Sequence, residues 1–382
     1  MSFLATSDVV IIGGGVIGLS IAYVLAGEGV SCTLLERGEL GQEASWAGAG
    51  IISPGSEKPS RLPSAQLRTL SANLHEEWSR SLKESTGIDN GYRRSGGVDV
   101  ALDDHDAAEL RSSAGRWRDE GISHERLEPK EFSRVEPALG PRVKLAYFLP
   151  DRAQIRNPRH LRALGEASQI RGATLLPQTA VESLILEGSR VTGVRTASGN
   201  FSCGQLIVAA GAWSESLLKT IGEELPTPPI RGQIVLFHPE RPLLRRIVEH
   251  GTRYLVPRDD GRVLAGSTEE YAGFDRSTTE EGIRGLIEFA ETICPVLRGV
   301  TVEKTWAGLR PGSLDRRPTI GPMAGWDNLI IATGHQRSGL QLSPGTAALV
   351  SDFVLGRTPR IDTRPFASDR PPSESRDEAF RS

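Results

Sequence analysis

The sequence predicts an α/β fold with an α+β insertion, in which a parallel-sheet domain is interleaved with an antiparallel-sheet domain. Residues 8–37 read as a strand, a glycine-rich turn, a helix and a second strand, the order of a parallel βαβ unit. Two further apolar runs, 206–209 and 328–333, have the composition of strands buried on both faces. The long intervals 56–150 and 225–320 separate these pieces, and the second is rich in short strand patterns.

The glycines of the βαβ unit have the spacing G-x-G-x-x-G. Gly13 permits a tight turn, Gly15 lets a pyrophosphate approach the backbone, and Gly18 lets the helix pack close to the strand. The second strand, 32–35, ends in Glu36, where a carboxylate can bind a ribose 2′-hydroxyl. The unit therefore predicts a dinucleotide site. The alternative is a βαβ unit that binds no nucleotide.

Composition narrows the functional class. The 382 residues suffice for about two domains, and the net charge of −3 indicates no nucleic-acid partner. The three cysteines, Cys32, Cys203 and Cys294, lack the spacing of metal ligands and read as buried thiols of a reducing compartment. Neither a signal peptide nor a membrane span is evident, so we expect a cytoplasmic protein without a metal.

The first interval begins after a run of small residues at 44–50. Such a run lets a flat ligand approach the backbone closely, although a mobile glycine loop would have the same composition. Apolar residues at steps of three and four predict a helix over 67–82, with Trp78 in the core. The interval continues with a strand at 98–102, a helix at 104–120 and a strand at 146–149.

The chain then returns to the parallel sheet. Asn157 is expected as the N-cap of a helix whose first residue is Pro158. Residues 181–203 alternate between apolar and polar, which is typical of an antiparallel meander. The strand at 206–209 is expected to break at Gly211 into a helix.

The second interval contains a predicted hairpin whose turn includes Asp260 and Gly261. A strand is expected from Thr301 to Ala307, with residues 308–311 ending it. The other elements expected up to residue 360 are strands at 234–237, 254–256 and 263–265, a helix at 279–294, a loop at 335–338 and a helix at 339–355.

Several motifs together resemble the D-amino-acid-oxidase group of flavoenzymes, most closely the glycine oxidases of the thiamine-biosynthesis type. The resemblance covers nearly the whole chain to about residue 360, and its motifs lie at 13–18, 36–37, 44–51, 209–214, 229–233, 306–311 and 334–339.

This resemblance implies a particular domain organisation. A Rossmann-like FAD-binding domain is expected from 1–55, 151–224 and 321–360, and an antiparallel-sheet substrate-binding domain from 56–150 and 225–320. Residues 361–382, rich in proline, serine and charge towards their end, are expected to form a disordered tail.

The resemblance also assigns residues to the cofactor. Monomeric sarcosine oxidases attach flavin through a cysteine late in the chain, and no cysteine follows Cys294, so non-covalent FAD is expected. The expected contacts are Gly13, Gly15, Val16, Ile17 and Gly18 at the pyrophosphate; Glu36 and Arg37 at the adenosine ribose; Ala44, Ser45, Ala49, Gly50 and Ile51 from the pyrophosphate to the flavin; Val181 at the adenine; Gly211 beside the cofactor; and His335, Gln336, Arg337, Ser338, Gly339, Leu340 and Gln341 around the flavin pyrimidine.

Three residues are expected to act on the substrate. Arg310 matches the arginine that pairs with the substrate carboxylate, and a guanidinium can bind a carboxylate through two hydrogen bonds. Tyr254 matches a substrate-contacting tyrosine. Arg337 is expected either to position the flavin or to contact the substrate. The alternatives are a structural salt bridge for Arg310 and a core role for Tyr254.

The implied reaction converts glycine, oxygen and water to glyoxylate, ammonia and hydrogen peroxide, by hydride transfer from the α-carbon to flavin N5. The resemblance suggests that water deprotonates the amine and gives His335 mainly backbone contacts. The imine could supply the thiazole of thiamine. The partners expected are a small amino acid and molecular oxygen, and the family is typically a homo-oligomer, a tetramer by resemblance.

One departure leaves the preferred amine open. Glu269 stands where the family has an apolar residue near the substrate; it could bind an ammonium or a basic side chain, but we expect it to face solvent. The rival functions are a sarcosine oxidase and a D-amino-acid oxidase or dehydrogenase. A hypothesis from another class is a non-catalytic FAD-binding subunit of a larger complex, which would lack the arginine and tyrosine that hold a carboxylate.

Overall fold

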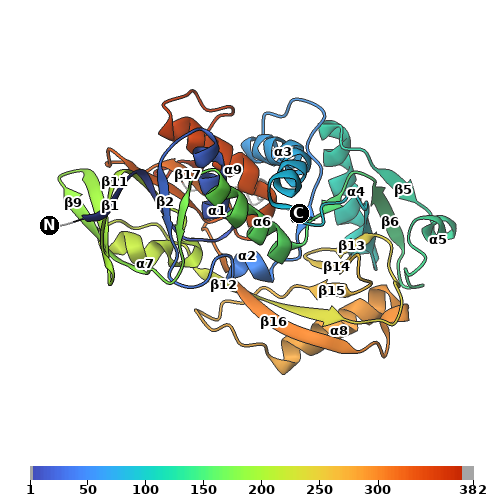
Figure 1. The fold of residues 1–382 in the computed structure, drawn as a ribbon. Helices are drawn as coiled ribbons and strands as arrows, with labels where there is room; N and C mark the ends of the chain where they lie inside the picture. Colours follow the sequence, from blue (N-terminus) through green and yellow to red (C-terminus); the bar gives the residue numbers. More distant parts are fainter. Residues whose placement is uncertain (1–2, 372–382) are drawn as a thin grey trace.

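Two eight-stranded sheets organise residues 3–371, the part of the chain that the computed structural model describes (Figure 1). The first sheet contains β1 (Phe3–Ile12), β2 (Cys32–Leu35), β8 (Thr174–Leu176), β9 (Val181–Glu187), β10 (Arg190–Thr196), β11 (Gly199–Val208), β17 (Thr319–Pro322) and β18 (Leu329–Thr333). Its order is β17-β18-β11-β1-β2-β8, with β10 and β9 extending from β11. The pairs from β18 to β8 are parallel, which confirms the parallel sheet assembled from separate pieces of chain.

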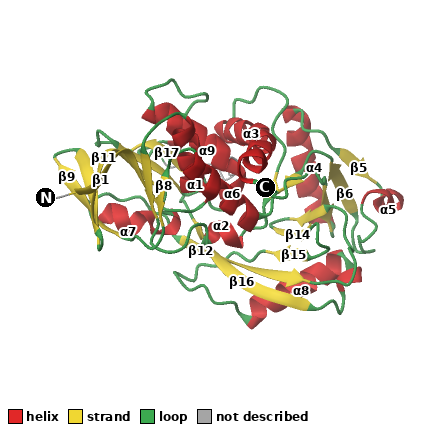
Figure 2. Ribbon diagram, viewed as in Figure 1, coloured by secondary structure: helices red, strands yellow, loops and turns green. Residues whose placement is uncertain are grey.

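Four helices pack together beside the first sheet (Figure 2). They are α1 (Val16–Gly27), α3 (Pro63–Thr86), α6 (Asn157–Ile170) and α9 (Gly339–Val354). Leu67 and Leu82 of α3 are fully buried in the same core as Leu19 of α1. Trp78 is buried there too, as expected. The helix that the sequence division places in the second domain therefore packs with the helices beside the first sheet, and the exact domain division stays a prediction.

One face of the second sheet packs in a core that is covered by a helix. The other face points towards the small-residue segment that follows the first βαβ unit. Its strands are β4 (Gly97–Ala101), β5 (Glu125–Leu127), β6 (Leu145–Leu149), β12 (Pro229–Phe237), β13 (Ile247–His250), β14 (Arg253–Pro257), β15 (Val263–Gly266) and β16 (Val302–Pro311). Their order is β16-β12-β15-β14-β13-β4-β6-β5, antiparallel except between β13 and β4.

Alternation along these strands separates the two faces. Val235, Val248 and Leu255 pack in one core with α8 (Glu280–Ile293). Ile234 and Tyr254 belong to a cluster on the opposite side, which includes Ala49 from the first half. The second face therefore meets the small-residue segment. The remaining named helices and strands are α2 (Ala44–Ala47), β3 (Ile51–Ile52), α4 (Asp104–Glu120), α5 (Phe132–Val135), β7 (Ala153–Gln154) and α7 (Ser214–Lys219).

Two local expectations are wrong. Helix α6 begins at Asn157 itself, and Arg156 is the N-cap, because the Asn157 side chain donates to the Ser45 carbonyl at 2.7 Å instead of capping its own helix. Strand β16 runs on to Pro311, because it pairs with β12 along its whole length, from Phe237 to Pro229. Arg310 consequently lies on a strand.

The expected tail is also wrong for residues 361–371. Phe366 is fully buried in the first core. Arg370 donates to both carboxylate oxygens of Asp315, at 2.8 and 2.9 Å. This apolar anchor and this ion pair give the segment a fixed path. The remainder of the expected tail, 372–382, lies outside the described residues.

The three cysteine thiols are buried and unpaired. Burial raises the pKa of Cys32 and of Cys203 to about 11, and raises that of Cys294 well above its ordinary value. All three therefore stay protonated at neutral pH. Among the described helices, none combines the length and the apolar character needed to cross a membrane.

Candidate active site

A cavity of about 440 Å³ lies between the first sheet's glycine-rich turn and the face of the second sheet that carries Ile234 and Tyr254. Helix α2 stands between the two sheets (Figure 1) and contributes to the wall. Every residue that the sequence assigned to the cofactor or the substrate lines this cavity, except Gly18. The structure thus brings together residues separated by more than three hundred positions, such as Gly13 and Gln341, while their individual contacts with a ligand stay predictions.

The glycine-rich turn leaves no room for side chains. Gly13 has a φ of +110°, and a Cβ there would lie 2.4 Å from the Ala209 carbonyl oxygen. A Cβ on Gly18 would lie 1.9 Å from the Gly13 oxygen, which explains why Gly18 packs beneath the turn rather than lining the cavity. The Val16 N–H donates to Ser45 Oγ at 2.9 Å, so the start of α1 is tied to the small-residue segment. A helix N-terminus open to a cavity favours a phosphate group.

Glu36 and Arg37 follow β2 and both line the cavity. The Glu36 carboxylate accepts hydrogen bonds from the backbone N–H groups of Gly14 and Gly38, at 2.7 and 2.8 Å, so it is held beside the turn. The Arg37 guanidinium lies 3.6 Å from the centre of the Trp213 ring and pairs with Glu43. Trp213, which lies in the motif at 209–214 but was assigned no contact, also lines the cavity.

The small-residue segment is fixed by close packing. A Cβ on Gly50 would lie 2.0 Å from the Ile155 carbonyl oxygen. The Asn157 Nδ2 group donates to the Ser45 carbonyl, whereas its Oδ1 atom is buried without a hydrogen-bond donor in the described part of the chain. Because Asn157 lines the cavity, this oxygen is available to a donor group on a ligand.

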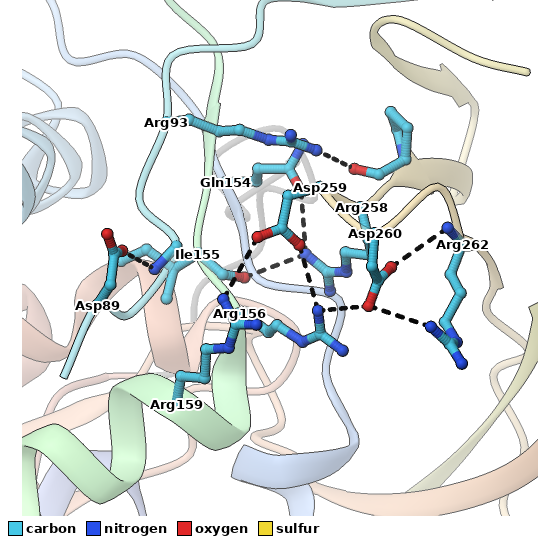
Figure 3. A network of polar contacts seen from close by, with 12 residues as sticks. Asp89, Arg93, Gln154, Ile155, Arg156, Arg159, Arg258, Asp259, Asp260 and Arg262 are labelled. Atoms are coloured by element: carbon cyan, nitrogen blue, oxygen red, sulfur yellow. Dashed lines mark hydrogen bonds and ion pairs between the residues drawn. The ribbon is translucent and has the colours of Figure 1, made fainter. Parts of the chain in front are cut away.

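Arg258 also holds the small-residue segment, and Figure 3 shows its guanidinium beside Gln154 and Ile155. Its Nη2 donates to the Ala49 carbonyl at 2.7 Å, and its Nη1 donates to Gln154 Oε1 at 3.0 Å and to the Ile155 carbonyl at 3.2 Å. Arg258 lies in the predicted Asp-Gly hairpin turn, which the antiparallel pairing of β14 and β15 confirms. The β14–β15 hairpin therefore supports the part of the cavity wall that the small-residue segment forms.

An ion-pair network surrounds this hairpin (Figure 3). Arg156 Nη1 lies 3.2 Å from Asp259 and 2.7 Å from Asp260. Arg159 also pairs with Asp259, and Arg262 with Asp260. These contacts link the start of α6 to the hairpin. They hold the hairpin that carries Arg258 in position from outside the cavity.

These features fit a dinucleotide. The glycines leave space against the backbone, the first turn of α1 faces the cavity, and Asn157 Oδ1 offers an unused acceptor. The wall contains no thiol, because none of the three cysteines lines the cavity. A cysteinyl link to a cofactor is therefore not available at this wall, and non-covalent binding stays a prediction.

Tyr254 and Arg310 lie over glycines on the cavity face of the second sheet. A Cβ on Gly266 would lie 2.7 Å from the Tyr254 hydroxyl oxygen. A Cβ on Gly232 would lie 2.0 Å from Arg310 Nη2. Both glycines pair with neighbouring strands in regular register, so they give the two large side chains room to lie along the sheet.

The Arg310 guanidinium has no carboxylate partner within residues 3–371, although it is partly buried. Its Nη1 donates to the Thr268 carbonyl at 3.1 Å and its Nη2 to Ser267 Oγ at 2.6 Å. Burial, followed by the nearby charge of Arg337, lowers the pKa of Arg310 to about 10, so the group is still charged at neutral pH. A charged guanidinium of this kind in a cavity wall is suited to an anionic ligand.

Arg337 and Glu269 are paired with each other. The Arg337 Nη1 lies 3.5 Å from Glu269 Oε2, and its Nη2 donates to the Thr252 carbonyl. Glu269 also lies 3.6 Å from Arg316. It is not among the cavity-lining residues, whereas Arg337 is. The structure therefore gives Glu269 a role in holding Arg337 rather than a place in the cavity.

The loop before α9 closes one side of the cavity. His335 Nε2 lies 3.0 Å from Thr346 Oγ1 on α9, and burial lowers the pKa of His335 to about 3. The imidazole is therefore neutral, and it anchors the loop. The Gln336 N–H donates to the Pro311 carbonyl at 2.9 Å, which connects this loop to the end of the strand that carries Arg310.

Sequence reasoning missed Glu249, which lines the cavity from β13. The four-residue strand Ile247–His250 is too short to show a clear period. Gly251, which follows it and has a φ of +58°, was the available signal for a hairpin into β14.

The chain is similar to known proteins over most of its length. A family model described as FAD dependent oxidoreductase matches residues 8–353. The chain is 39% identical to a glycine oxidase of Pseudomonas aeruginosa over 363 residues, covering 94% of this chain and 98% of that protein. It is 34% identical over 358 residues to the Bifunctional protein ThiO/ThiG of Synechocystis sp., covering 92% of this chain and 52% of that protein. The crystal structure of a glycine oxidase from Geobacillus kaustophilus superposes with a TM-score of 0.91 at 31% identity, covering 96% of this chain and 99% of that one.

Proposed function

This chain belongs to the family of FAD-dependent oxidoreductases and is an amino-acid oxidase, and on that premise we propose that it oxidatively deaminates glycine. FAD, when bound, supplies the two-electron oxidation that converts the amine to an imine. The observation that carries the proposal is the guanidinium of Arg310, which lines the cavity beside Tyr254 without a carboxylate partner in the described chain.

Arg310 is proposed to bind the substrate carboxylate. An arginine has five N–H donors, and two of these are used by Thr268 and Ser267. The remaining three can form a two-bond contact with a carboxylate, while the two protein bonds fix the plane of the guanidinium. The Tyr254 hydroxyl is proposed to add one more hydrogen bond to the same group. Holding the carboxylate in this way orients the α-carbon for oxidation.

The product and the electron acceptor are proposed from the relatives. The similarity to glycine oxidases favours glycine as substrate and oxygen as acceptor, with glyoxylate, ammonia and hydrogen peroxide as products. The alignment with about half of the protein named Bifunctional protein ThiO/ThiG, together with the resemblance noted in the sequence motifs, supports a use of the imine in building the thiazole of thiamine. A cytoplasmic location and a homo-oligomer, a tetramer by resemblance, stay predictions.

An anaerobic reduction screen tests this function. The purified FAD-loaded protein is mixed with glycine, sarcosine and small D-amino acids, and loss of the visible flavin absorbance is followed. The proposal expects the fastest loss with glycine, then recovery of the absorbance and formation of peroxide when air is admitted. Faster bleaching with sarcosine or a D-amino acid would identify that amine, and not glycine, as the preferred substrate. Reoxidation by a quinone but not by oxygen would indicate a dehydrogenase, and no bleaching with any amine would favour a non-catalytic FAD-binding subunit.

A further inference from the structure

Glu249 is a buried carboxylic acid on the wall of the cavity, only 6% exposed. It pairs directly with Tyr254 across β13 and β14, and with Asp99 across β13 and β4. Residues directly opposite each other in adjacent strands project from the same face of a sheet. Glu249 therefore lies on the face that carries Tyr254, beside the residue that we propose contacts the substrate.

The charges behind Glu249 are not balanced. Arg152 lies between β6 and β7 and is 2% exposed. Its guanidinium donates to both carboxylate oxygens of Asp99, and its Nη1 lies 2.6 Å from Glu249 Oε2. The last contact lacks the geometry of a hydrogen bond, so Glu249 Oε2 has no donor in the described part of the chain. One guanidinium thus lies beside two carboxyl groups, and it forms its hydrogen bonds with Asp99 rather than with Glu249.

The groups that face Glu249 come from four parts of the fold. Asp99 lies on β4, Tyr254 on β14, Arg152 before β7 and Arg337 in the loop before α9. Burial raises the pKa of Glu249 above its ordinary value, against the lowering effect of Arg152; Asp99 raises it further and Arg337 lowers it. A carboxyl group whose pKa is raised accepts a proton more readily than an ordinary glutamate.

An amino-acid substrate needs an acceptor for the proton of its ammonium group. In water it carries a carboxylate and an ammonium, and oxidation at the α-carbon requires the free lone pair of the neutral amine. His335 is poorly suited to take the ammonium proton, because burial keeps it neutral and it is bound to Thr346. On the second sheet's side, the cavity wall offers Arg310 for the negative end of the substrate and Glu249 as the acid residue for the positive end.

We propose that Glu249 binds the amino group of the substrate and accepts its proton, an inference that rests on the proposed oxidation of an amino acid. One N–H bond of the ammonium breaks, one O–H bond forms on the Glu249 carboxylate, and the electron pair stays on nitrogen. This proposal differs from the sequence-based expectation that water removes the proton. It also gives the site an acceptor for amines that is separate from the carboxylate-binding Arg310.

The test is the FAD-loaded Glu249→Gln protein, compared with Glu281→Gln on the exposed surface of α8. The glutamine keeps the shape of the side chain but cannot accept the proton. We expect the rate of anaerobic flavin reduction by glycine near neutral pH to fall by about a hundredfold or more, since a positioned base contributes roughly 10²–10⁴-fold. The rate should recover as the pH approaches the pKa of the substrate's own amino group. The Glu281→Gln protein should keep the wild-type pH profile.

Two further measurements distinguish a proton-accepting Glu249 from a purely structural Glu249. They also distinguish failure of this proposal from failure of the proposed function. Acetate, which has a carboxylate but no amine, should bind Glu249→Gln as tightly as the wild type, by calorimetric titration. Asp99→Asn removes the neighbouring negative charge, so the acid limb of the rate profile should move to lower pH while the plateau persists. An unchanged profile in Glu249→Gln, or loss of acetate binding along with activity, would overturn the proposal. Absence of reduction by any amine in the wild type would instead reject the proposed function.

Discussion

Replacing Gly232 by alanine should displace the Arg310 guanidinium without unfolding the protein. Gly232 on β12 pairs with Gly308 on β16, and Arg310 lies two residues beyond Gly308, so its side chain emerges on the same face of the sheet. An alanine Cβ at position 232 would lie 2.0 Å from Arg310 Nη2 and 2.4 Å from Cζ and Nη1. The obstructed atoms are the far end of a flexible side chain, so the guanidinium can move aside.

The structure gives the size of the effect. Ordinary carbon contacts begin near 3.4 Å, so the guanidinium must move by more than about 1 Å. Such a shift removes at least one of two charge-assisted hydrogen bonds to the substrate, each worth about 1.5–3 kcal/mol. The Michaelis constant for glycine should therefore rise roughly 10- to 150-fold. The Arg310→Ala variant removes both bonds and should raise it by about 10²–10⁴-fold while FAD stays bound.

The assay is the initial rate of glycine oxidation against glycine concentration, together with the FAD content and the melting temperature. Gly285→Ala is a matched control, because a Cβ on that residue of α8 would meet no atom within 4 Å. The control should keep the wild-type Michaelis constant. A Gly232→Ala protein that is folded and fully loaded with FAD, yet binds glycine as the wild type does, would refute the carboxylate role of Arg310.

Three other predictions concern the site and the core. Tyr254→Phe should raise the Michaelis constant for glycine up to about tenfold, because it removes one hydrogen bond of about 0.5–1.5 kcal/mol; steady-state kinetics check this. Burial lowers the pKa of His75 to about 4 and those of His160 and His335 to about 3, so the unfolded chain binds more protons. Stability should therefore fall as the pH drops below about 6.5, by up to about 4 kcal/mol per pH unit, which denaturant melts at several pH values measure. Acid precipitation should release all the flavin into the supernatant, and yellow colour retained on the polypeptide would contradict non-covalent binding.

The parts of the fold that are encoded locally could be predicted from the sequence. The βαβ unit was predicted because an apolar strand, three spaced glycines and a terminal Glu36 act within thirty residues. The helix Asp104–Glu120 was predicted at its observed bounds, since Asp103 caps it and Gly121 ends it in a left-handed conformation. Arg310 and Tyr254 were found through family motifs, and the structure places both on the cavity wall.

The remainder depends on contacts between distant segments. Asn157 was misread as a helix cap because its side chain bonds to Ser45, more than a hundred residues away. The course of residues 361–371 depends on Phe366 in the core and on the pairing of Arg370 with Asp315. Glu249 was invisible because nothing in a four-residue strand reveals which strand will lie beside it.

The burial of the three thiols has a consequence for an enzyme whose reaction with oxygen would release hydrogen peroxide. Peroxide oxidises thiolates rather than thiols, and these cysteines are both enclosed and protonated. Met323 is likewise shielded within the core beside β18. These four sulfur atoms are therefore shielded from peroxide, and sustained turnover should leave them unoxidised without an added reductant.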